Sequence, residues 1–271
     1  NDRRQRQMCI RDRNSSAHLF EFLLRQGDSA LVLGHRTSEW CGLAPAIEED
    51  IALANIALDL IGQAKLWLEY ASEEDGVGRS ANDLAFLRDA YDFRNLLMLE
   101  LPNEDFARTI MRHFLFDAFQ VPWLEALSAS SDQRVSDIAQ KAEKEALYHL
   151  ERSEDAVIAL GDGTEESNQR MQKALSDLWS FAGEMFRDDD IDRAMHDVAI
   201  APLPSKLQSN WKMKVHGTLQ RAYLNPPKSE FSHSGGRLGF RHTEHLGHML
   251  ATMQFLPVSY THLRAHETHN D

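Results

Sequence analysis

Cysteine is scarce in this 271-residue sequence, which contains only Cys9 and Cys41. Two cysteines provide no disulfide framework and no CxxC pair for metal or redox chemistry, and such usage fits a reducing cytoplasm. Cys41 stands between Trp40 and Gly42. We expect it to be a small core residue, as free cysteines usually are.

The sequence also lacks a long uninterrupted apolar run and an excess of positive charge. Lysine and arginine number 29 against 42 aspartates and glutamates, so the formal net charge is -13. An acidic surface repels nucleic acid and anionic lipid, and neither is expected as a partner. A membrane span is not expected either, because the longest apolar stretch, residues 51–68, is interrupted by Asn55, Asp59, Gln63 and Lys65.

The two ends differ in composition from the body. Residues 1–16 carry five arginines in an otherwise acidic protein, and residues 257–271 carry three histidines and no apolar stripe. Both ends resemble translated adaptor sequence, so we predict that they are non-native flanks around a body of residues 17–256. Two ordinary disordered tails are the alternative.

Helical periodicity dominates the body, and no stretch shows the sustained two-residue alternation of β-strands. Capping residues such as Asp132 mark helix starts, and Pro45 and Gly161 mark breaks. Pro122 is expected to kink a helix or to end it early. The expected helices cover residues 18–39, 47–72, 84–91, 103–128, 132–160, 165–186, 188–198, 204–219 and 242–256.

The order of these helices predicts a fold class. Two long helices are followed by a long connection that holds a short helix, and then by two further long helices. A long crossover between the second and third helices is typical of ferritin-like bundles, whereas simple up-and-down bundles have short loops throughout. We therefore predict an all-α protein, a ferritin-like four-helix bundle over residues 17–256 with additional C-terminal helices.

The second long helix carries an unusual pattern. Residues 51–60 are apolar almost without a break, so the helix is expected to be buried on all sides. Asn55, Asp59 and Gln63 nevertheless recur every four residues, and we expect them to form one buried polar stripe. Buried polar groups need partners, so the stripe is expected to face something polar inside the bundle.

In ferritin-like di-iron proteins that polar feature is the metal, held by Glu from two helices and Glu-x-x-His from the other two. The corresponding frames here read Asp59-Leu-Ile-Gly62, with glycine in place of histidine, and Ala146-Leu-Tyr-His149, with alanine in place of glutamate. Glu145 is one residue out of phase. Each half-motif lacks one ligand, so we predict no metal ligands and no catalytic residues on this chain. An ordinary buried acid and an ordinary core histidine are the alternative for Asp59 and His149.

Several ordered segments resemble a known family. They are Ser38-Glu-Trp-Cys-Gly42, the run from Asp50 to Ala64, Glu100-Leu-Pro-Asn103, Lys144-Glu-Ala-Leu-Tyr-His149, Gly161-Asp-Gly-Thr164 and His242-Thr-Glu-His-Leu-Gly247. Across about residues 18–256, the chain is similar to PaaC-type subunits of the bacterial phenylacetyl-CoA epoxidase, which are ferritin-like proteins.

The resemblance implies a structural, non-catalytic subunit that pairs with a PaaA-type catalytic subunit in the cytoplasm. The implied complex contains further subunits and a reductase, and it epoxidises the ring of phenylacetyl-CoA with dioxygen and NADPH in aerobic phenylacetate degradation. Di-iron would belong to the catalytic subunit, and FAD and an iron–sulfur centre to the reductase, with no cofactor bound by this chain. Asp117 would be another degenerate position of the lost di-iron site.

The densest group of potential ligands is His242, Glu244 and His245, near the C-terminus. Their spacing uses two helix faces and is not the HExxH pattern of a zinc site. We interpret them as possible contacts with another subunit.

Two other functions stay open. The chain could be an active di-iron carboxylate oxygenase or oxidase that uses Asp59, Asp117, Glu145 and His149. It could also be a stand-alone helical binding protein with no link to an oxygenase.

Overall fold

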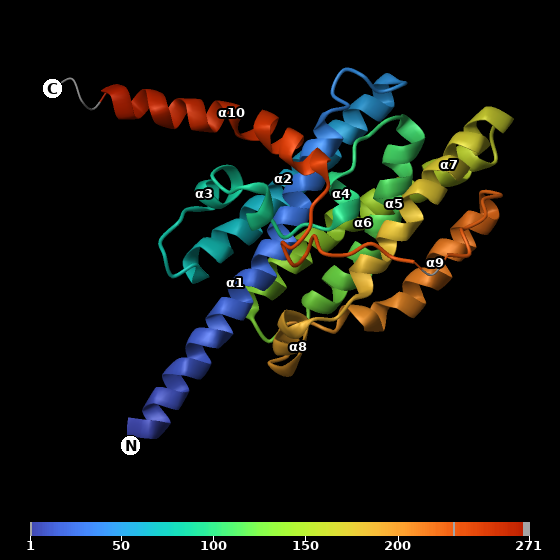
Figure 1. Cartoon of the computed structure of the whole chain (residues 1–271). Helices are drawn as coiled ribbons and strands as arrows, with labels where there is room; N and C mark the ends of the chain where they lie inside the picture. The colour runs from blue at the N-terminus through green and yellow to red at the C-terminus, as the bar shows by residue number, and fades with distance from the viewer. Residues whose placement is uncertain (1, 230, 268–271) are drawn as a thin grey trace.

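The computed structural model describes the backbone of residues 2–229 and 231–267, and the side chains of residues 16–229 and 231–257. All regular secondary structure within the described backbone is helical (Figure 1). In chain order the elements are α1 (Asp2–Ser38), α2 (Ile47–Glu74), α3 (Ala81–Phe86), η1 (Ala90–Asp92), α4 (Leu97–Glu100), α5 (Phe106–Leu127), α6 (Gln133–Gly161), α7 (Glu165–Ala182), η2 (Gly183–Phe186), α8 (Asp190–Asp197), η3 (Pro204–Leu207), α9 (Gln208–Arg221) and α10 (Glu244–Glu267).

Helices α1, α2, α5 and α6 form the predicted four-helix bundle (Figure 1). Short turns join α1 to α2 and α5 to α6, so each of these pairs is antiparallel. The connection from α2 to α5 runs through α3, η1 and α4 before α5 begins. This long crossover confirms the ferritin-like prediction.

Contacts between helices fix the register of the bundle. Tyr70 Oη, near the end of α2, donates to Asp132 at the start of α6 (2.6 Å), and Gln63 Nε2 donates to Glu145 Oε2 (2.8 Å) further along the same two helices. The aspartate caps begin the second pair of helices: Asp105 accepts from Arg108 N, and Asp132 accepts from two backbone N–H groups at the start of α6. The bundle thus presents facing positions of α2 and α6 to each other along most of their length.

Several helix ends differ from the sequence expectation. The helix expected over residues 18–39 begins already at Asp2, and the last helix extends to Glu267 instead of ending near residue 256. The side chains of the two predicted non-native flanks, residues 1–16 and 257–271, lie almost wholly outside the described set. Their non-native origin therefore stays a prediction.

Pro122 lies inside α5, which continues to Leu127, so of the two expected effects, a kink or an early end, the early end does not occur. Its neighbours explain the continuation. Phe119 and Trp123 are both buried and stack with ring centroids 5.7 Å apart, which holds this part of α5 against the core. Tertiary packing of this kind outweighs a local loss of helical hydrogen bonding.

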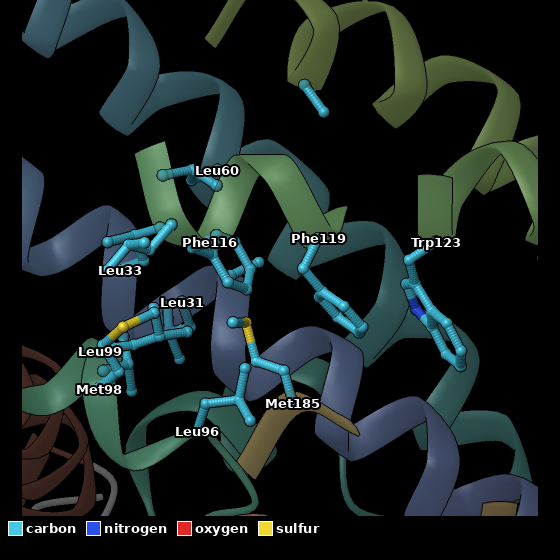
Figure 2. Packing of buried hydrophobic residues seen from close by; sticks show 14 of the residues in the cluster. Leu31, Leu33, Leu60, Leu96, Met98, Leu99, Phe116, Phe119, Trp123 and Met185 are labelled. Carbon is cyan, nitrogen blue, oxygen red and sulfur yellow. The ribbon is translucent and has the colours of Figure 1, made fainter. Parts of the chain in front are cut away.

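The hydrophobic core joins the bundle to the crossover. Figure 2 shows Leu31 and Leu33 from α1, Leu60 from α2 and Phe116 from α5 converging on the crossover residues. Each fully buried side chain of this size contributes about 1.5–3 kcal/mol. The crossover is therefore part of the core, and its buried residues include Leu96, Leu97, Met98, Leu99 and Leu101.

The expectation that α2 is buried on all sides is wrong. Ile47, Ile51 and Leu58 are 70%, 58% and 67% exposed, and they share one side of the helix, which we call the α2 outer face. This helix is also long and apolar enough to cross a membrane by length and hydropathy alone, but half of the relevant window is buried in the bundle. Burial of half of this window is typical of a core helix that has one apolar side at the surface.

Cys41 is exposed, which corrects the expectation of a core cysteine. The residue lies in the turn between α1 and α2, where Cys41 N donates to Ser38 O at 3.1 Å. Residues in such connecting turns lie at the surface.

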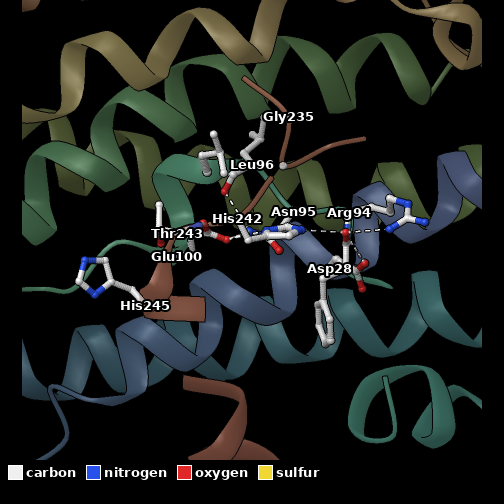
Figure 3. Close-up of polar contacts among 12 residues, drawn as sticks. Asp28, Arg94, Asn95, Leu96, Glu100, Gly235, His242, Thr243 and His245 are labelled. Carbon is white, nitrogen blue, oxygen red and sulfur yellow. Dashed lines mark hydrogen bonds and ion pairs between the residues drawn. The ribbon is translucent and has the colours of Figure 1, made fainter. Parts of the chain in front are cut away.

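A buried ion pair holds the crossover to α1. The Arg88 guanidinium donates to both carboxylate oxygens of Asp28. Arg94 N also donates to Asp28 Oδ2, at 2.8 Å, and Figure 3 shows these two residues side by side. The Asp28 side chain is fully buried, and that of Arg88 is 3% exposed. The Arg88 guanidinium also lies over the ring of Phe93, 4.3 Å from its centroid. All the charge on this pair is therefore neutralised inside the protein.

The segment before α10 closes over the crossover by means of two buried glutamates. Glu184 Oε1 accepts from the backbone N–H groups of Gly235 (2.9 Å) and Gly236 (2.8 Å), while its Oε2 accepts from Leu97 N (2.8 Å). Glu100 forms a corresponding set of contacts with His242 and Thr243, described below. The C-terminal segment thereby becomes part of the main core instead of a separate unit.

Candidate functional site

The interior between α2 and α6 brings Asp59 and His149 together. His149 Nε2 lies 3.1 Å from Asp59 Oδ2. The His149 side chain is 2% exposed, while that of Asp59 is 36% exposed at the rim of the bundle. Burial lowers the pKa of His149, and the adjacent Asp59 carboxylate partly opposes that shift. The two residues therefore form a hydrogen-bonded pair that reaches the surface on one side.

The predicted polar stripe is only partly present. Gln63 is buried and donates to Glu145, and Asp59 is half-buried, but Asn55 is exposed. Four residues turn an α-helix by about 400°, so each step of four rotates the next side chain by about 40°. Asn55 and Gln63 are consequently about 80° apart, which is enough to place one outside the bundle and the other inside. The expectation of a buried Asn55 is therefore wrong.

A second polar group lies deeper, between α1, α5 and α6. Asp117 on α5 is almost fully buried and accepts a hydrogen bond from Ser153 Oγ at 3.2 Å. His113 lies one turn earlier on α5, with its Nδ1 3.9 Å from Asp117 Oδ2 and its Nε2 2.9 Å from Thr37 Oγ1. The polar interior thus consists of this group and the separate Asp59–His149 pair.

The hydrogen-bond pattern assigns the protons in the deeper group. The Thr37 hydroxyl donates to Leu33 O at 2.7 Å, so towards His113 it must accept, and the proton of His113 lies on Nε2. Nδ1 then faces Asp117 as an acceptor without a hydrogen-bond partner. Burial lowers the pKa of His113 and raises the pKa of Asp117 well above its usual range. A neutral imidazole beside a protonated carboxyl is the state that these shifts favour.

Gly62 and Ala146 differ in burial and in the space around them. Ala146 is buried within α6, while Gly62 is half-buried, and a Cβ added to it would meet no atom within 4 Å. A side chain at position 62 would therefore point into open space beside the α2 outer face. The two vacant ligand slots inferred from sequence do not face one common cavity.

These residues do not fit a di-iron centre. No group of three or more His, Cys, Asp or Glu side chains that could hold a metal ion occurs among the described residues. Asp117 accepts a hydrogen bond from Ser153 Oγ, and His113 Nδ1 lies 3.9 Å from its Oδ2. Glu145 is bonded to Gln63 instead of joining His149. We derive no metal chemistry from this interior.

Replacing Asp117 with asparagine is expected to stabilise the protein increasingly as pH rises. The folded-state pKa of Asp117 lies above its unfolded value near 3.9. Between these two values the unfolded chain has lost the proton that the folded chain retains, so wild-type stability falls with rising pH. The advantage of D117N should grow by up to about 1.4 kcal/mol per pH unit in that interval.

Urea unfolding across pH 4–8, a range of roughly four units above the unfolded pKa, measures this difference. Asp155→Asn is the matched control, because Asp155 is exposed on α6. A pH-independent difference between D117N and the wild type, equal to that of the control, would contradict a buried and protonated Asp117.

The three residues His242, Glu244 and His245, which we interpreted as possible contacts with another subunit, lie in different environments. The His242 side chain is 3% exposed, and its Nδ1 lies 2.9 Å from Glu100 Oε2 (Figure 3). Its Nε2 lies 3.2 Å from Phe93 O, so His242 serves contacts within this chain. Glu244 is exposed, and His245 is half-buried and apart from this cluster in Figure 3. Only these last two could contribute to an interface with another subunit.

Sequence reasoning missed four residues of the polar interior: Thr37, His113 and Ser153 in the bundle, and Glu100 beneath the C-terminal segment. One signal was available. His113 precedes Asp117 by four residues with only apolar residues between them, and this spacing places the two on one face of the helix. Nothing local could indicate Glu100, because its partner His242 is 142 residues away in the sequence.

The fold and the interior together define a class. The chain is a ferritin-like four-helix protein in which hydrogen-bonded side chains occupy the space between the bundle helices, without a set of metal ligands among the described residues.

Comparisons with known proteins identify the family. The family described as phenylacetic acid catabolic protein matches residues 7–264, so the chain belongs to that family. The chain is also 46% identical over 238 residues to the C subunit of 1,2-phenylacetyl-CoA epoxidase from Escherichia coli strain K12. That alignment covers 88% of this chain and 95% of the relative. The resemblance to PaaC-type subunits is thereby confirmed.

Proposed function

We propose that this chain is the structural, non-catalytic subunit of a multicomponent di-iron monooxygenase that epoxidises the ring of phenylacetyl-CoA in aerobic phenylacetate degradation. It would pair with and support a PaaA-type catalytic subunit in the cytoplasm. The name of the relative, as a subunit of such an epoxidase, supports this role. The observation that carries the non-catalytic part is that the candidate ligands are bonded within the chain: Glu145 accepts from Gln63, and Asp117 accepts from Ser153.

The cofactors of the reaction then belong to other chains. Di-iron would lie in the catalytic subunit, FAD and the iron–sulfur centre in the reductase, and NADPH would supply electrons to the complex. This chain would bind none of them. The sites at Asp59, Gly62, Asp117, Ala146 and His149 are, on this proposal, degenerate di-iron positions.

The α2 outer face is the surface that suits a partner subunit. Ile47, Ile51 and Leu58 remain exposed on one side of α2. Tyr148, which is 48% exposed, lies on the neighbouring helix between Glu145 and Arg152. Glu145 contacts Gln63 of α2, and Arg152 contacts Glu49 of α2. A contiguous exposed apolar surface of this kind is typical of protein interaction sites. We assign it to the PaaA-type subunit.

Iron analysis of the co-expressed pair tests the role. We expect roughly two irons per catalytic subunit, as in other ferritin-like di-iron proteins, and none on this chain after separation. His149→Ala should leave the iron content of the complex unchanged, as should the control His248→Ala at an exposed position of α10.

Two outcomes would favour the other functions. Iron on the separated chain, lost in His149→Ala but kept in His248→Ala, would indicate an active di-iron oxygenase or oxidase. Failure of the wild-type chain to co-purify with any PaaA-type partner would favour a stand-alone helical binding protein.

A further inference from the structure

A cleft of about 440 Å³ opens between α7, α9 and the segment that follows α9, away from the polar interior of the bundle. Its walls include four aromatic side chains, Trp179, Phe186, Trp211 and Phe231. The volume lies within the range of about 300–1,000 Å³ that is typical of small-molecule sites. None of the residues discussed above as degenerate di-iron positions lines it.

The aromatic walls are fixed before any ligand arrives. Trp211 is 3% exposed, and its Nε1 donates to Leu115 O at 2.9 Å, which sets the orientation of the indole. Trp211 packs against Phe186 with ring centroids 5.3 Å apart and against Trp179 at 5.7 Å. Trp179 itself is half-buried and lines the cleft. A rigid aromatic wall that is partly open to solvent provides a stacking surface at low entropic cost.

The segment that contributes much of the cleft is richer in basic residues than the chain as a whole. The chain has a formal net charge of -13, yet residues 198–243 contain seven lysines and arginines and one acidic residue. Lys214 and Arg221 pair with Glu154, and Arg237 pairs with Asp192. Lys212 lines the cleft and has no ion-pair partner among the described residues.

The described lining of the cleft contains a second basic group and no carboxylate. His216 lines it with its ring 6.1 Å from that of Trp179 and nearly perpendicular to it. Gln208 and Ser229 add neutral polar groups. The ammonium group of Lys212 would therefore attract an anion to this cleft.

We propose that this cleft binds a planar aromatic ligand that carries an anionic group. The ring would stack on the half-buried indole of Trp179, which Trp211 supports from the core side, and the anion would pair with Lys212. Two kinds of molecule share this chemistry, a nucleotide with a base and phosphate, and an aryl carboxylate. The inference does not depend on the subunit role, because it uses a surface separate from the α2 outer face.

Titration of the full-length chain with four probes distinguishes the contribution of the aromatic ring to binding from that of the anionic group. Adenosine 5′-monophosphate and benzoate represent the two sources, adenosine supplies a ring without the anion, and inorganic phosphate supplies the anion without a ring. Quenching of tryptophan fluorescence and calorimetry measure binding. We expect saturable binding of one aromatic anion, with adenosine and phosphate each weaker by roughly tenfold or more, because one charge-assisted contact or one stacking contact is then missing.

Two lysines two residues apart on α9 provide the matched variants. Lys212→Ala is expected to weaken binding of the aromatic anion by roughly tenfold, since it removes the charged partner at the cleft. Lys214→Ala should leave binding unchanged, because Lys214 pairs with Glu154 outside the cleft lining. Both positions are exposed, and circular dichroism confirms that each variant folds.

Saturation by the nucleotide and not by benzoate assigns the first source, and the reverse assigns the second. The proposal is overturned if neither aromatic anion saturates, if phosphate alone binds as tightly as the nucleotide, or if Lys212→Ala and Lys214→Ala behave alike. Loss of partner capture in Lys212→Ala without any ligand binding would assign the cleft to a protein contact instead.

Discussion

An aspartate in place of Leu58 is expected to stop this chain from co-purifying with its catalytic partner. Leu58 is 67% exposed on the α2 outer face, with Ile51 on the same side of the helix. The substitution removes the apolar contact that Leu58 would make with the partner. It also buries a carboxylate without a partner at the interface, which adds a desolvation cost. Affinity should fall by at least about a hundredfold.

The stability of the isolated chain should barely change, because position 58 already faces solvent in the free protein. Met213→Asp is the matched control, since Met213 is 69% exposed but lies on α9. Unchanged capture of the partner by Leu58→Asp would remove the α2 outer face as the docking surface. A dimer of the isolated wild-type chain that Leu58→Asp dissociates would show that a second copy occupies this face.

Replacing Asp28 with alanine is expected to destabilise the protein by about 3–5 kcal/mol, the usual cost of breaking a buried ion pair from one side. The Arg88 guanidinium would remain buried without its carboxylate, and Arg94 N would lose its acceptor. The loss should be visible as a large drop in the urea midpoint.

Two further variants isolate the cause. Glu166→Ala removes an exposed partner of Arg170 on α7 and should cost only about 0–1 kcal/mol. Asp28→Leu combined with Arg88→Met removes both buried charges, and it should recover part of the stability lost in Asp28→Ala. A double variant no more stable than Asp28→Ala would mean that packing around Asp28, and not its charge, dominates the effect.

The order of the helices was predictable because it depends on local signals. Asp105 and Asp132 cap the helices that the sequence predicts at those places, and the long crossover followed from the polar residues after α2. Packing was harder to predict than helix order. Pro122 is accommodated within α5 because Phe119 and Trp123 hold both sides of it in the core.

The candidate site was predictable only in part, for a geometric reason. The pairing of Asp59 with His149 follows from two polar residues on facing core helices, but a spacing of four residues does not keep side chains on one line. Asn55 therefore turned outward, and a side chain at Gly62 would face open space. The sequence predicted the positions of the polar residues along α2 correctly. The directions of their side chains around the helix axis could be determined only from the structure.

The embedding of the C-terminal segment has a consequence for the order of folding. Glu100 and Glu184 lie beneath residues 235–243, and the contact from Glu100 to His242 spans 142 positions of the chain. While the polypeptide is being synthesised, both carboxylates lack the donors that this segment provides until it leaves the ribosome. The four bundle helices precede this segment in the chain, so the contacts that seal the crossover are available only after the bundle helices have been synthesised. A chain shortened before residue 235 would lack α10 and the donors to Glu100 and Glu184, and we expect its apolar crossover to be more open to proteases and chaperones.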